Sequence, residues 1–124
     1  MTAFRHEVTD ADTAVAVGSG DVPVLATPRL IAWMEAATVR AAAPFTGSGR
    51  TTVGTQVRIR HLRATPVGGQ VEVSAGTAAS GAGGRLTFAV RAVDASGRLV
   101  ATGEIDRAIV DRESFLARVQ AADR

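Results

Sequence analysis

The stretch VLATPRLIAWMEAATVRA at residues 24–41 decides the fold. Thr27 predicts the N-cap of a helix, and Pro28 suits the first helical position, where its missing N–H costs nothing. Apolar side chains then recur at spacings of three and four residues: Leu30, Ile31, Trp33, Met34, Ala37 and Ala41. Such a helix is apolar on most of its sides and has to be surrounded by other elements. Pro44 is expected to end it.

Segments with β-branched and alternating apolar residues predict strands on both sides of this helix. Two short strands are expected at residues 4–9 and 13–17. Four longer ones are expected at residues 51–63, 70–80, 85–94 and 98–110, separated by turns. Asp111 is expected to cap a short terminal helix.

The strand at residues 51–63 alternates clearly. Its pattern places Val53, Val57 and His61 on one face, and Gly54 on the opposite face with Arg58. A glycine inside a strand also indicates a bulge or a close approach of the backbone to another group.

The order of these elements predicts an α+β fold, in which a long antiparallel sheet wraps around one central helix and a short C-terminal helix follows. This arrangement is the hotdog fold. The 124 residues have the length of one ordinary domain, so residues 1–124 are expected to form a single domain.

The composition narrows the possible functions. Hydrophobic residues make up 46% and charged residues 21% of the chain, as in globular proteins. The chain has no cysteine and no lysine, which excludes thiolate and Schiff-base catalysis and zinc sites built from cysteine. No spacing of His, Asp and Glu resembles a metal site. A net charge of +2 and few aromatic residues disfavour nucleic-acid binding. The absence of a signal peptide and of a long apolar stretch predicts a cytoplasmic protein that does not enter membranes.

Few residues are able to carry chemistry. Glu35 is the only ionisable residue between Arg29 and Arg40 on a helix expected to be mostly buried, so it is either functional or lies on the one hydrated stripe of that helix. His61 ends the apolar face of a strand beside a turn, where it is either a site residue or an ordinary core or rim histidine. His6 is expected on the surface.

Two motifs in the chain resemble a known family. Residues 24–37 and residues 53–68 are similar to the central-helix motif and the strand motif of the fluoroacetyl-CoA thioesterase-like branch of the hotdog-fold thioesterases. The similarity continues through Gly103, Arg107 and the expected terminal helix. It implies a hydrolase that cleaves acyl-CoA thioesters, with CoA entering only as part of the substrate and with no metal or other cofactor.

The resemblance also implies which residues form the site. It assigns Thr27, Glu35 and His61 to a catalytic set and places Gly54 and Arg107 at the oxyanion and substrate-binding positions. Thr27 and Glu35 are about 12 Å apart along a helix, too far for a direct hydrogen bond. The family resolves this distance by forming homodimers, which also assemble into tetramers, with sites built from both subunits. Glu35 is expected to act either as a general base or as a nucleophile.

Residues 17–23, just before the helix motif, contain no aromatic residue where the fluoroacetyl-specific enzyme has a phenylalanine-rich lid. The sequence therefore predicts a thioesterase for short acyl groups without fluoroacetyl specificity. Two alternatives remain: a non-catalytic acyl-CoA-binding protein of the same fold, and a thioesterase that acts on acyl-carrier protein. A dehydratase or hydratase of this fold places its histidine and acid differently and is disfavoured.

Overall fold

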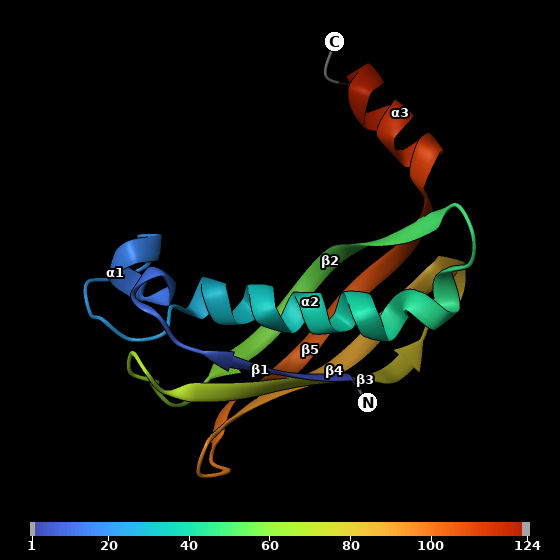
Figure 1. The fold of residues 1–124 in the computed structure, drawn as a ribbon. Coiled ribbons are helices and arrows are strands. Elements are labelled where there is room, and N and C mark those ends of the chain that lie inside the picture. Colours follow the sequence, from blue (N-terminus) through green and yellow to red (C-terminus); the bar gives the residue numbers. More distant parts are fainter. Residues whose placement is uncertain (1, 123–124) are drawn as a thin grey trace.

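The structure, a computed structural model, describes residues 2–122 and shows a helix lying across a curved sheet (Figure 1). The elements in chain order are β1 (Thr2–Glu7), η1 (Asp10–Asp12), α1 (Ala14–Val17), α2 (Thr27–Thr46), β2 (Arg50–His61), β3 (Gln70–Ser80), η2 (Ala82–Gly84), β4 (Arg85–Asp94), β5 (Leu99–Asp111) and α3 (Arg112–Ala122). The strand order is β1-β3-β4-β5-β2, with every neighbouring pair antiparallel. The expected α+β fold is confirmed.

The core lies between α2 and the concave face of the sheet. Leu30, Met34 and Ala37 of α2 are fully buried there. They belong to one cluster with side chains from the strands, among them Val71, Val73, Phe88, Val90 and Ile105. Burial of this apolar surface is the main force that holds the helix on the sheet. Val39 and Phe45, on another side of α2, are half-exposed, so this chain alone covers the helix only in part.

The expected strand at residues 13–17 is wrong. Thr13 forms an isolated bridge with Leu25, and the next residues form the single helical turn α1. The Thr13 side chain caps this turn by accepting a hydrogen bond from the Ala16 N–H at 3.2 Å. Gly18, with φ of +85°, ends the turn in the left-handed conformation. Local capping therefore outweighs the strand preference of the two valines in the turn.

The two ends of α2 also differ from the expectation. Ala26 is the N-cap, and Thr27 is the first helical residue, so the Thr27 hydroxyl is free to bind elsewhere. Pro44 lies inside the helix, which continues to Thr46. The missing Pro44 N–H is tolerated because it falls in the last turn, at an exposed position.

A β-bulge interrupts the pairing of β2 with β5. Gly54 lies opposite Arg107 and Gln56 lies opposite Asp106, so Thr55 is the extra residue. The expectation of a bulge or close approach at Gly54 is confirmed, but its predicted face is wrong. The extra residue reverses the alternation, so that Gly54 shares the concave face with Val57 and His61.

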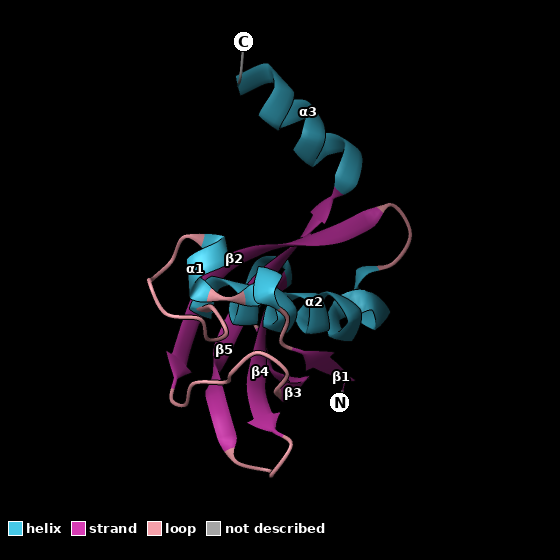
Figure 2. Ribbon diagram, turned by 60° about the vertical axis from the view of Figure 1, so that its left-hand side comes forward, coloured by secondary structure: helices cyan, strands magenta, loops and turns pink. Residues whose placement is uncertain are grey.

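The terminal helix α3 projects away from the rest of the chain (Figures 1 and 2). As expected, Asp111 caps it, accepting a hydrogen bond from the Ser114 N–H at 2.9 Å. Its apolar residues Leu116 and Val119 are half-exposed. Within residues 2–122, no helix combines the length and the apolar character needed to cross a membrane.

Candidate active site

The carboxylate of Glu35 points from α2 to the bulge in β2. A Cβ atom added to Gly54 would lie 2.5 Å from Glu35 Oε2, closer than real Cβ contacts allow. Only glycine at this position therefore leaves the carboxylate where it is. The Glu35 side chain is 38% exposed, so solvent or a ligand has access to it.

Arg107 reaches the same carboxylate from β5. Its Nη1 lies 3.3 Å from Glu35 Oε2. Its Nε donates to Thr52 Oγ1 at 2.8 Å, and its Nη2 donates to the Thr52 carbonyl oxygen at 3.1 Å. Burial lowers the pKa of the Arg107 guanidinium, while the nearby Glu35 charge raises it. Arginine stays protonated in proteins, so Arg107 is a fixed positive charge that holds Thr52 and Glu35 together.

Thr27 and His61 form a second polar pair near the start of α2. The Thr27 hydroxyl and His61 Nδ1 are 2.8 Å apart, and the tautomer of the ring decides which one donates. Burial lowers the pKa of His61, which favours the neutral ring at neutral pH. His61 Nε2 is buried and finds no hydrogen-bond partner within residues 2–122. The hydroxyl that sequence analysis assigned to capping is thus bound to the strand histidine.

This pair borders a cleft of about 350 Å³. The segment between α1 and α2 contributes Ser19, Gly20, Asp21 and Val22 to its walls, and the end of β2 contributes Leu62 and Arg63. No wall residue is aromatic apart from the His61 ring. The walls of the cleft therefore present both polar and apolar groups.

Within one chain the two groups of site residues stay apart. Thr27 and Glu35 are eight residues apart on α2, which is about 12 Å at the rise of a helix. Gly54 and His61 lie on β2 as well, one before and one after Val57 along the strand. The described residues contain no hydrogen bond between the Thr27–His61 pair and the Glu35–Arg107 pair.

The structure changes the interpretation of two other polar residues. His6 is half-buried and stacks on Trp33, with ring centroids 4.3 Å apart, although it was expected on the surface. Burial lowers its pKa. Arg58 faces the convex side of the sheet, where it binds Glu104 and Asp106. It lies on the opposite side of the sheet from Glu35.

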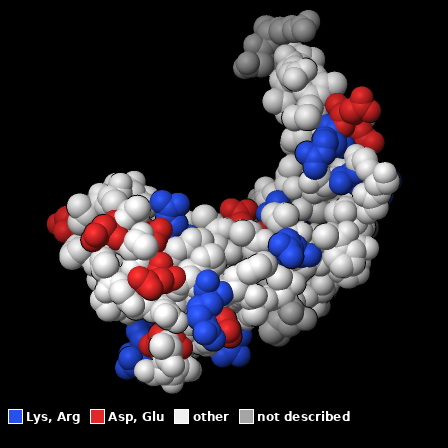
Figure 3. All heavy atoms as spheres, in the orientation of Figure 1, with Lys and Arg blue, Asp and Glu red and all other residues white. Residues whose placement is uncertain are grey.

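Charges of both signs are interspersed on the face drawn in Figure 3, without a continuous basic surface.

Sequence analysis missed Thr52, which binds Arg107, because only the pairing of β2 with β5 brings the two residues together. In the part of the chain that the structure describes, no three His, Asp or Glu residues are placed to hold a metal ion.

A long antiparallel sheet around a central helix, with these polar residues on its concave side, defines the class of hotdog-fold thioesterases. A family model described as fluoroacetyl-CoA-specific thioesterase matches residues 8–113. The chain belongs to this family and is a thioesterase.

Individual relatives agree with this assignment. The fluoroacetyl-CoA thioesterase of Streptantibioticus cattleyicolor is 37% identical over 97 residues, which cover 78% of this chain and 68% of the relative. A crystal structure of a mutant of the fluoroacetyl-CoA-specific thioesterase FlK, in complex with fluoroacetate and CoA, matches with a TM-score of 0.89 and 28% identity over 100% of both chains. A thioesterase superfamily member from Thermus thermophilus matches with a TM-score of 0.90 and 28% identity, over 98% of this chain and 89% of that protein.

Proposed function

We propose that this chain hydrolyses coenzyme A thioesters of short acyl groups, with Glu35 as the central catalytic residue. The observation that carries the proposal is the close approach of Glu35 Oε2 to the bulge at Gly54, where the missing side chain lets a half-exposed carboxylate lie against the backbone of β2. Arg107 holds the carboxylate from one side only. Membership of the thioesterase family supports the reaction type, and the CoA present in a FlK complex supports the substrate class.

The reaction requires three catalytic roles from the protein. Glu35 accepts a proton from water as the water oxygen attacks the carbonyl carbon, or attacks that carbon itself and forms an anhydride. A backbone N–H at Gly54 stabilises the oxyanion, a contribution of roughly 3–4 kcal/mol in comparable sites. Cleavage of the carbon–sulfur bond releases the CoA thiolate, which accepts a hydrogen bond from the neutral His61 ring that Thr27 orients. The thiolate is then protonated by the proton that Glu35 took from water, or by solvent in the anhydride route, where water hydrolyses the anhydride.

Hydrolysis in ¹⁸O-labelled water separates the two roles of Glu35. In a single turnover with excess enzyme, a general base places ¹⁸O in the acid product. In the anhydride route, attack of water on the Glu35 carbonyl carbon places ¹⁸O in the Glu35 carboxylate, and the released acid carries one oxygen from the thioester and one unlabelled oxygen from Glu35. Mass spectrometry of the peptide that contains Glu35 reads the result.

A second copy of the chain completes the site in this proposal. The strand β2 lies at the edge of the sheet, so a further strand has hydrogen-bonding groups to pair with. Val39 and Phe45 on α2 are exposed and gain cover from a partner. Two chains joined antiparallel along β2 would form one continuous sheet, with the two halves of each site coming from different subunits.

One register of this pairing fits a site shared between the two subunits. Residues directly opposite each other in an antiparallel pair point to the same face. Pairing Arg58 with Arg58 of the partner subunit obeys this rule, and the bulge at Thr55 then sets Gly54 opposite the partner subunit's His61. The two-fold axis passes near Arg58, and the Glu35 and Gly54 of one subunit face the Thr27 and His61 of the other.

Thiol cross-linking tests this register cleanly because the chain has no cysteine. In the double variant Gln56→Cys, Arg60→Cys, each new thiol faces the other type across the two-fold axis, so oxidation yields a covalent dimer. Neither single variant has an opposed thiol, so neither cross-links. Sedimentation at assay concentration distinguishes dimer from tetramer, and a monomeric active enzyme contradicts the shared site.

Steady-state hydrolysis of a panel of short acyl-CoA esters, with detection of free thiol, tests the function. Turnover by the wild type is expected to fall at least about 100-fold in Glu35→Ala, because the proton acceptor or nucleophile is lost. The matched control is Glu72→Ala, which removes an exposed carboxylate from the convex face of β3. A folded wild type that binds a CoA thioether but turns over no CoA ester would contradict the proposal. Turnover of acyl-carrier protein alone would reassign the substrate.

We also propose that the enzyme lacks fluoroacetyl specificity. The segment between α1 and α2 borders the cleft with small and polar residues, including Ser19, Gly20 and Asp21. Without an aromatic side chain there, the pocket distinguishes the two substrates only by the small difference between a fluorine and a hydrogen atom, and the discrimination is expected to stay within about tenfold in kcat/KM. The ratio of kcat/KM for fluoroacetyl-CoA over acetyl-CoA is therefore expected near or below that value. A far larger ratio would overturn this expectation.

A further inference from the structure

The bulge in β2 is held from both faces of the sheet by arginine side chains. On the concave face, Arg107 of β5 binds Thr52, on one side of the bulge. On the convex face, Arg58 of β2 binds residues of β5 on the other side of the bulge. The bulge residue itself takes part, because Thr55 Oγ1 donates to the Asp106 carbonyl oxygen at 3.3 Å. The strand is thus fixed to β5 on both sides of its irregularity.

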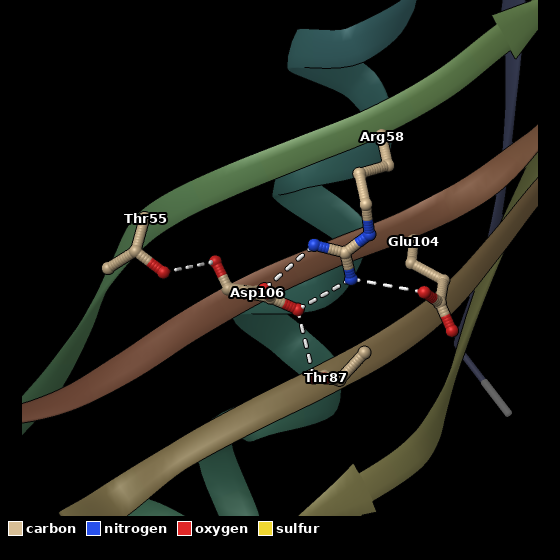
Figure 4. A network of polar contacts seen from close by, with 5 residues as sticks. All are labelled: Thr55, Arg58, Thr87, Glu104 and Asp106. Carbon is tan, nitrogen blue, oxygen red and sulfur yellow. Dashed lines mark hydrogen bonds and ion pairs between the residues drawn. The ribbon is translucent and has the colours of Figure 1, made fainter.

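Asp106 is the centre of the convex-face contacts (Figure 4). Arg58 Nη1 donates to its Oδ2 and Arg58 Nη2 to its Oδ1, both at 2.9 Å. Thr87 Oγ1 of β4 donates to Oδ1 at 2.8 Å, and Arg58 Nη2 also reaches Glu104 Oε1 at 3.0 Å. Two-pronged arginine–carboxylate contacts are both strong and geometrically demanding. The network therefore fixes the register of β2 against β5 and of β5 against β4.

The register of β2 determines which of its residues lies against the Glu35 carboxylate. In a regular strand without the bulge, the alternation would turn Gly54 to the convex face and bring a neighbour with a Cβ atom to the concave face. That Cβ would meet the Glu35 carboxylate, since even a Cβ on Gly54 would lie 2.5 Å from Oε2. Asp106 and Arg107 are adjacent on β5, and the pleat sends them to opposite faces. The adjacent residues Asp106 and Arg107 thus hold the bulge from the convex and the concave face of the sheet.

We propose that Asp106, held by Arg58 and Thr87, is a positioning residue that sets the place of Gly54 against Glu35 from the opposite face of the sheet. The inference rests on the proposed function, because it requires Glu35 and Gly54 to act on the thioester. Asp106 never touches the substrate. Asp106 acts by holding the backbone of β2 in place. Its loss is therefore expected to lower kcat and to leave binding of the CoA portion unchanged.

The variant Asp106→Asn tests this inference, because it keeps the size of the side chain and removes the charge that holds Arg58. We expect kcat to fall about tenfold with KM within twofold of the wild type, since displacements of less than 1 Å at the reacting groups have effects of this size. The matched control Glu72→Gln removes another charged group from the convex face, where Glu72 pairs with Arg5, and leaves kcat unchanged. Thr87→Val removes only one hydrogen bond to Asp106 and supplies a milder variant, expected to lower kcat about threefold.

A double-variant comparison separates positioning from general destabilisation. In the Gly54→Ala background the carboxylate is already displaced, so Asp106→Asn is expected to have no further effect on kcat while its effect on the melting temperature persists. Equal losses of kcat in both backgrounds would show a purely structural role and overturn the inference. If Glu35→Ala is inactive and Asp106→Asn matches Glu72→Gln, the inference alone fails. If Glu35→Ala keeps full activity, the proposed function itself fails.

Discussion

The sheet carries an arginine–carboxylate pair on each face, and the two differ in how completely the carboxylate is bound. On the convex face, both oxygens of Asp106 accept hydrogen bonds from Arg58, and Oδ1 accepts another from Thr87. On the concave face, Arg107 contacts Glu35 through a single atom pair at 3.3 Å. The Asp106 side chain is 9% exposed, against 38% for Glu35. The first carboxylate is bound at both oxygens, and the second is bound at one oxygen only.

This difference separates structure from chemistry. A carboxylate that accepts hydrogen bonds at both oxygens from two side chains holds strands together and is a poor proton acceptor for water. A carboxylate held at one oxygen is oriented and still reactive. Hydrogen bonds from Arg58 and Thr87 lower the pKa of Asp106 to about 2, so it stays charged throughout the physiological range. The comparison predicts that changes around Glu35 act on turnover and changes around Asp106 act first on the sheet.

The largest expected effect is that of Gly54→Ala. The new Cβ would lie 2.5 Å from Glu35 Oε2, so the carboxylate has to move and kcat is expected to fall about 100-fold. Stability is expected to stay equal or to rise by up to about 1 kcal/mol, because alanine loses less conformational entropy than glycine in a strand. Thiol-release kinetics and urea unfolding on the same preparation measure the two quantities. Full turnover in this variant would show that the position of the Glu35 carboxylate against the bulge does not control kcat.

The next effect concerns stability. Arg107→Gln removes the hydrogen bonds to Thr52 from a guanidinium that is nearly buried, which is expected to lower the free energy of unfolding by about 2 kcal/mol. Arg58→Gln is expected to lower it by about 1 kcal/mol, since the Arg58 side chain is 40% exposed and its ion pairs are partly screened. Urea unfolding of both variants makes the comparison. A larger loss for Arg58→Gln would reverse the ranking of the two faces.

A smaller effect follows from the pH dependence of the convex pair. The pKa of Asp106 is about 2 in the folded chain and near 3.8 when unfolded, so the unfolded state binds a proton first as the pH falls. The stabilisation is complete above about pH 4 and disappears between about pH 4 and pH 2. Urea unfolding over this range is expected to give a flatter curve for Asp106→Asn than for the wild type. Parallel curves would show that Asp106 is not the source of the acid sensitivity.

The smallest expected effect is that of Glu104→Gln. Glu104 binds the outer edge of the Arg58 guanidinium, but its side chain is 49% exposed. Exposed ion pairs contribute about 0–1 kcal/mol, so the free energy of unfolding is expected to change by less than about 0.5 kcal/mol. Addition of 0.5 M salt to the wild type is expected to have a similarly small effect. A loss as large as that of Arg58→Gln would mean that Glu104, not Asp106, dominates the convex pair.

Sequence patterns predicted the sheet well because local alternation reports burial directly. The strands β3 and β4 begin and end at the predicted residues, and the central helix begins at Thr27, one residue before the predicted first position, Pro28. The same patterns singled out Glu35 and gave Gly54 two possible roles, a bulge and a close approach, and both are present. In each of these positions the residue type stands out against its own segment, as a carboxylate in an apolar helix or a glycine inside a strand.

Predictions that depended on distant partners were wrong or absent. The predicted face of Gly54 was wrong because the bulge becomes visible only in the pairing with β5. The Thr27 hydroxyl was assigned to the helix N-terminus, although it binds His61, which lies 34 residues further along the chain. Asp106 carried no signal of its own, since a carboxylate in an alternating strand looks like any exposed residue until the pairing of β2 with β5 brings Arg58 within hydrogen-bond distance.

The stacking of His6 on Trp33 has a practical consequence. Trp33 is the only tryptophan, and the chain has no tyrosine, so the near-ultraviolet emission of the protein reports on a single indole ring. That ring lies two residues before Glu35 on α2 and rests flat against the imidazole of β1. The fold has thus placed an intrinsic fluorophore at the contact between its first strand and its central helix, where any shift of one against the other changes the light it emits.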